Sequence, residues 1–84
     1  MDEANVDLVL DAPPDAATVR HLRDQARDSG ASAIATFEVS GEGTYYLVIS
    51  GRGTCVLLKD GVSVQTYNPS YDDAHVAEAL LSDA

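Results

Sequence analysis

Residues 33–67 read AIATFEVSGEGTYYLVISGRGTCVLLKDGVSVQTY, and this stretch decides the fold of the chain. Short runs rich in β-branched and aromatic residues are separated by glycine-containing connections, a pattern typical of successive β-strands. The connection Asp60-Gly61 is the strongest local signal, because Asp-Gly between two such runs favours a two-residue type I′ hairpin turn. We therefore predict an antiparallel meander of four strands, over residues 33–40, 45–50, 54–59 and 62–67.

Another strand is expected before the meander. Val6, Leu8 and Leu10 alternate with the intervening residues at a period of two, which predicts a short strand. Pro13 and Pro14 end this strand, because proline has no N–H to donate to a sheet ladder.

Two helices are expected, one before the meander and one after it. The first begins at Pro14 or Asp15 and ends at Gly30, a residue suited to the C′ position of a helix. The second follows Ser70, which we expect to be the N-cap, with Asp73 three residues on as in a capping box. The apolar stripes of the two helices comprise Val19, Leu22 and Ala26, and Val76, Ala77, Leu80 and Leu81.

The expected elements follow one another in the order β-α-β-β-β-β-α. A chain of 84 residues has room for one hydrophobic core. We therefore predict a single domain over residues 1–84 with a two-layer α+β fold. In this fold the four-stranded antiparallel meander is extended by the N-terminal strand and packed by the two helices.

The chain is strongly acidic, and this limits its partners. It has ten Asp and four Glu against four Arg and one Lys, and its formal net charge is -9 at pH 7. So few cations cannot form the broad basic face that contacts phosphates, and we expect no direct nucleic acid binding. A nucleic acid mimic, whose carboxylates imitate phosphates, is a further possibility, and it requires those carboxylates to lie along one ridge.

In composition the chain resembles small acidic haloarchaeal proteins, because Asp outnumbers Glu, Arg outnumbers Lys, and carboxylates are spread along most of the sequence. This resemblance carries no motif, so it implies adaptation to molar salt and no particular activity. An acidic interaction protein from a cell of low salt content is the alternative interpretation. The N-terminal residues do not resemble a signal peptide, and no stretch approaches the roughly 20 apolar residues of a membrane span. We therefore expect a cytoplasmic protein without membrane contact.

The central strands of the meander are apolar at consecutive positions, over residues 45–49 and 55–58. An antiparallel sheet with one face in water would instead alternate apolar and polar residues. Either the two helices are divided between the two faces, or a partner covers the second face. The simplest partner is a second copy, packed face to face or edge to edge, and we expect a homodimer. The expected interface comprises Tyr46, Val48, Val56 and Leu58, with Tyr45 and Tyr67 at its rim.

No catalytic or metal-binding motif stands out in the sequence. His21 and His75 lie on different expected helices, and no Cys-x-x-Cys or His-x-x-x-His spacing occurs, so we expect no metal and no cofactor. Cys55 lies within an apolar run and is expected to be a buried structural residue. We therefore expect a non-enzymatic interaction or regulatory module. The alternative is a ligand-binding or enzymatic domain whose site forms at a homodimer interface, with the tyrosines, His75, Asp72 and Asp73 around it.

Three of the five cations, Arg20, Arg23 and Arg27, are expected on the first helix. Such a group of guanidinium groups is one way to bind an acidic group or an anion. Asp24, however, lies four residues after Arg20 and three before Arg27, where helical side chains meet. We therefore expect local ion pairs on a solvated helix face.

Overall fold

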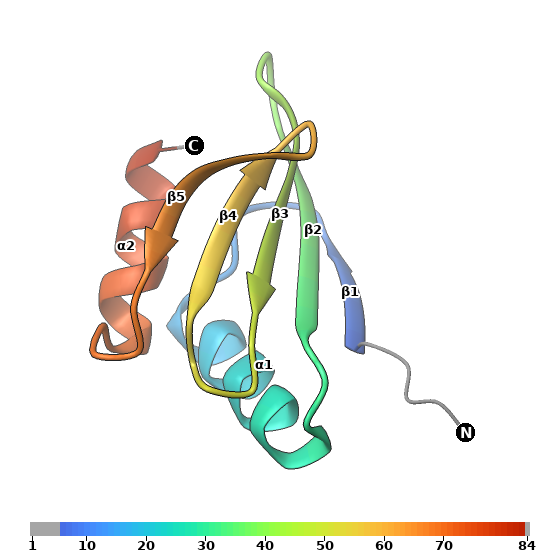
Figure 1. Ribbon diagram of the computed structural model, residues 1–84. Helices are drawn as coiled ribbons and strands as arrows, with labels where there is room; N and C mark the ends of the chain where they lie inside the picture. Colours follow the sequence, from blue (N-terminus) through green and yellow to red (C-terminus); the bar gives the residue numbers. More distant parts are fainter. Residues whose placement is uncertain (1–5, 84) are drawn as a thin grey trace.

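A five-stranded sheet, in the order β1-β2-β3-β4-β5, forms one layer of the structure. The computed structural model describes residues 6–83, and its elements are β1 (Val6–Leu10), α1 (Ala16–Ser29), β2 (Ala33–Val39), β3 (Gly43–Ile49), β4 (Cys55–Lys59), β5 (Val62–Tyr67) and α2 (Asp73–Asp83) (Figure 1). β1 is parallel to β2. From β2 onward, each strand pairs antiparallel with the next strand in the sequence, up to β5. The predicted α+β class and the predicted order of elements are confirmed.

The hairpin between β4 and β5 has the conformation that its two residues favour. Asp60 and Gly61 have φ angles of 54° and 83°, and a type I′ turn requires positive values at both positions. The turn sets the pairing of Lys59 with Val62, and a bulge follows where the register shifts beyond Leu58. The last hairpin of the meander is therefore specified by its turn residues.

Local hydrogen bonds define where α1 begins and ends. The Asp15 carboxylate accepts a hydrogen bond from the Thr18 backbone N–H at 2.9 Å, which makes Asp15 the N-cap. Gly30 has a φ of 75°, and its N–H donates to the Ala26 carbonyl at 2.9 Å. Both termini therefore lie where the sequence predicted them.

The N-cap of α2 differs from the prediction. The carboxylate of Asp72, not the hydroxyl of Ser70, accepts a hydrogen bond from the His75 backbone N–H, at 2.8 Å. Ser70 instead donates its own backbone N–H to the side-chain oxygen of Asn68, at 3.2 Å. This local turn after Asn68 holds Ser70 outside the helix, so the capping position moves to Asp72.

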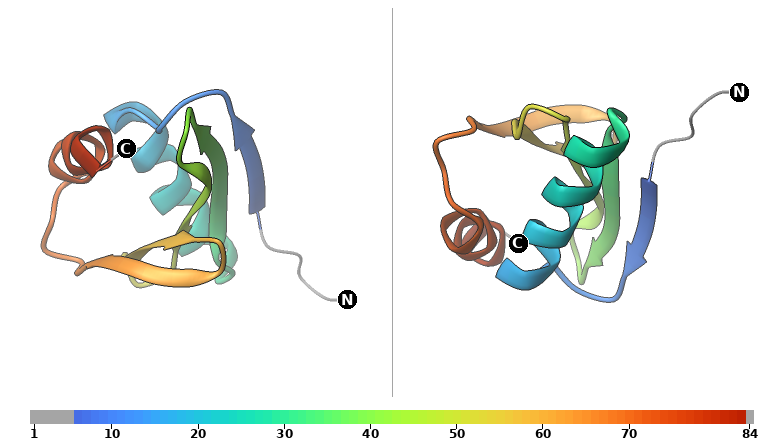
Figure 2. Two further views of the ribbon diagram at one scale, coloured as in Figure 1. Left: turned by 90° about the horizontal axis from the view of Figure 1, so that it is seen from above. Right: turned by 90° about the horizontal axis from the view of Figure 1, so that it is seen from below.

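Both helices lie on the same side of the sheet, in the hollow formed by its curvature (Figure 2). α1 packs on the sheet and α2 packs mainly on α1. Small residues in β2, Ala33 and Ala35, are fully buried on this side and allow close approach of the helix layer. The core comprises Val19, Leu22 and Ala26 of α1, Val76, Ala77 and Leu80 of α2, and the inward side chains of β2, β3, β4 and β5. The division of the helices between the two faces is therefore excluded.

Candidate functional site

The sheet face away from the helices carries apolar side chains without a covering layer within the described part of the chain. Cross-strand pairing sets these residues side by side: Ile34 pairs with Val48, and Val48 with Val56. In the next row, Thr36 pairs with Tyr46, and Tyr46 with Leu58. We call this surface the open face; its members on the described strands are Asp7, Val9, Ile34, Thr36, Glu38, Thr44, Tyr46, Val48, Val56, Leu58, Ser63 and Thr66.

Side chains at the centre of the open face are half-buried by one another. Ile34, Val48 and Val56 all have intermediate exposure, whereas their sequence neighbours on the helix side are fully or almost fully buried. Val9, on the edge strand β1, is 82% exposed. Apolar side chains are therefore contiguous on this face from β2 to β4.

A shallow hollow of about 490 Å³ lies within the open face, toward the β4–β5 turn. Its lining residues are Ile34, Thr44, Tyr46, Val48, Leu58, Asp60 and Gly61. Asp60 is the one carboxylate and Tyr46 the one phenol among these seven residues, and the set includes no histidine or cysteine. The polar side chains of the lining are thus Thr44, Tyr46 and Asp60, among apolar neighbours.

The structure brings together the four residues predicted at the centre of an interface. Val48 and Val56 are direct cross-strand partners, as are Tyr46 and Leu58. Their position on one uncovered face agrees with the prediction, and their role in binding stays a prediction.

The expected position of Tyr45 and Tyr67 at the rim of that surface is wrong. Tyr45 is 5% exposed and stacks on Phe37 at a ring separation of 5.8 Å, on the helix side of the sheet. Tyr67 is 2% exposed and pairs with Cys55, which also faces the helices. Successive residues of a strand point to opposite faces, so Tyr45 cannot share a face with Tyr46.

Sequence reasoning missed Val9 and Ile34 as members of the open face. The signal for Ile34 lay in the size of its neighbours, because Ala33 and Ala35 are the small residues that a packed helix requires. Val9 follows from the same alternation, since Leu8 and Leu10 pack against the core. The alternation of side chains along each strand was therefore sufficient to find both residues once the covered face was known.

Arginines of α1 link that helix to the first turn of α2. The Nε atom of Arg20 lies 3.2 Å from a carboxylate oxygen of Asp73, and Nη1 of Arg23 lies 3.3 Å from the other oxygen. Nη1 of Arg23 also donates to the Tyr71 carbonyl at 2.7 Å. Only Arg27 has the expected partner, Asp24, at 2.8 Å. The prediction of local pairs is thus wrong for Arg20, because α2 packs on α1 and supplies Asp73.

Cys55 lies under the same cluster and is buried. Its sulfur accepts a hydrogen bond from Nη2 of Arg23 at 3.3 Å. Burial raises the pKa of the Cys55 thiol, and the nearby Arg23 guanidinium opposes this only in part. The thiol therefore stays protonated at neutral pH, and its environment is that of a structural cysteine rather than a nucleophile.

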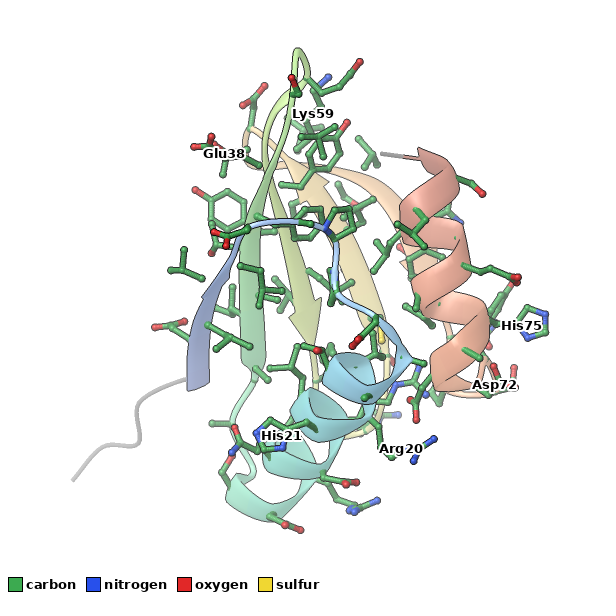
Figure 3. The ribbon with its side chains drawn as sticks, turned by 180° about the vertical axis from the view of Figure 1, so that it is seen from behind. Arg20, His21, Glu38, Lys59, Asp72 and His75 are labelled. Carbon is green, nitrogen blue, oxygen red and sulfur yellow. The ribbon has the colours of Figure 1, made fainter. Side chains whose placement is uncertain are left out.

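His75 and Asp72 lie on the outer side of α2, away from the sheet (Figure 3). Nδ1 of His75 is 3.3 Å from the Asp72 carboxylate, and both side chains are exposed. Neither residue lines the hollow of the open face. Within residues 6–83 no group of three or more His, Cys, Asp and Glu residues is placed to hold a metal ion.

Comparison of the chain with protein-family models, with curated proteins and with solved structures finds no match. Neither of the two described helices is long and apolar enough to cross a membrane. The function is therefore argued from the open face itself.

Proposed function

We propose that the protein is a small non-enzymatic interaction module that works as a homodimer through its open face. One observation carries this proposal: both helices cover the same side of the sheet and leave apolar residues on the other side in water. Burial of such residues is favourable by about 25 cal/mol per Å² of apolar surface removed from water. A second copy supplies an apolar surface of the same size and kind.

The size of the open face suits a dimer that dissociates on dilution. Five strands about 4.8 Å apart, each contributing about five residues at 3.3 Å, cover roughly 400 Å². Two copies would bury roughly 800 Å² in total, which is below the roughly 1,200 Å² of stable specific interfaces and in the range of weak, transient ones. We therefore expect association that depends on protein concentration.

Salt is part of the proposal, because the net charge is -9 and like charges repel. The described charged residues of the open face, Asp7 and Glu38, are both acidic, and Asp60 lies at the edge of the hollow. At about 1 M ionic strength the Debye length is about 3 Å, so this repulsion is largely screened. A cytoplasm with molar salt is accordingly the proposed setting.

The test is the molar mass in about 2 M KCl, measured by light scattering over a range of protein concentrations. We expect a monomer–dimer equilibrium, and we expect Val48→Asp to shift it to the monomer because a carboxylate would be buried in the interface. Val62→Asp is the matched control, since Val62 is exposed and pairs with Lys59, away from the open face. A folded monomer at every concentration would refute the homodimer, as would equal dimerisation of the two variants.

The alternative function is ligand binding between two copies, and the hollow is the observation that supports it. Its volume of about 490 Å³ falls in the range of small-molecule sites. This alternative requires the hollow to stay empty when the open face is covered. A partner side chain that fills the hollow would exclude it.

A further inference from the structure

We draw no further inference here: the strongest candidate, the outer edge of β5, where Val62 and Val64 are exposed beside a hollow of about 340 Å³, carries none because nothing in the described part of the structure shows what covers this edge.

Discussion

The two faces of the sheet are built from the same strands and differ in what lies over them. Leu47 and Leu57 face the helices and are fully or almost fully buried, whereas Val48 and Leu58, one residue further along, are only partly buried on the open face. The difference shows that apolar character does not by itself make a core. A strand residue becomes core only where a second layer removes it from water.

The largest expected effect is a difference in the loss of stability when each of two adjacent leucines of β4 is replaced by alanine. Leu57→Ala should destabilise the fold by about 2–5 kcal/mol, because it leaves a cavity under the helices. Leu58→Ala should cost about 1 kcal/mol in the monomer, since its side chain is already partly in water. Urea unfolding at low protein concentration in about 2 M KCl measures both values. Equal losses would mean that the open face is covered within the monomer.

A smaller effect is expected where α2 is held over the covered face. Asp73→Ala removes the shared partner of Arg20 and Arg23 and leaves the mostly buried Arg23 guanidinium without its carboxylate. We expect a loss of about 1–3 kcal/mol. The control Asp24→Ala removes only an exposed pair with Arg27 and should cost less than about 0.5 kcal/mol. Thermal unfolding measures both losses of stability. Similar losses in the two variants would show that the ion pairs of Asp73 do not stabilise the packing of α2.

Charge on the open face should set the salt dependence of the dimer. Asp7 lies on the open face beside Ile34 and has the same sign of charge as the chain as a whole, so Asp7→Asn should lower the dimer Kd several-fold at low salt and less in 2 M KCl. Glu78→Gln, on the exposed side of α2, is the control for net charge. Sedimentation at a series of KCl concentrations measures the Kd values. An equal response to both substitutions would assign the salt effect to overall charge.

The smallest effect concerns the N-caps of the two helices. Hydrogen bonds from the backbone N–H groups of Thr18 and His75 lower the pKa of Asp15 and of Asp72 below the ordinary value of 3.8. A lowered pKa stabilises the fold above the pKa of the unfolded chain, and this contribution is lost as the pH falls below about 3.8 through the folded value. Asp15→Asn and Asp72→Asn keep a capping group that does not titrate, so each should reduce the loss of helix signal in circular dichroism between pH 4 and pH 2. An unchanged acid transition in both variants would remove the caps as its cause.

Much of the fold could be predicted because its signals are local. The Asp60-Gly61 turn, the Asp15 cap and the Gly30 terminus each depend on the conformations open to a few neighbouring residues. The centre of the candidate site followed from the two apolar runs in β3 and β4. The cap of α2 was misplaced because three residues suited to capping, Asn68, Ser70 and Asp72, precede the helix. In the structure Asn68 accepts a hydrogen bond from the Ser70 N–H, and Asp72 accepts one from the His75 N–H.

The sequence by itself determined the order of elements, the hairpin turns, the acidic surface and an excess of apolar residues on the central strands. Tertiary structure alone decided that both helices lie on one side, that Tyr45 is core and Tyr46 is not, and that Asp73 is the partner of Arg20. The physical reason is the distance along the chain between the residues that interact. Turns and caps depend on hydrogen bonds between close neighbours in the chain, whereas the choice of a covered face depends on the packing of α1 and α2 against strands distant in sequence.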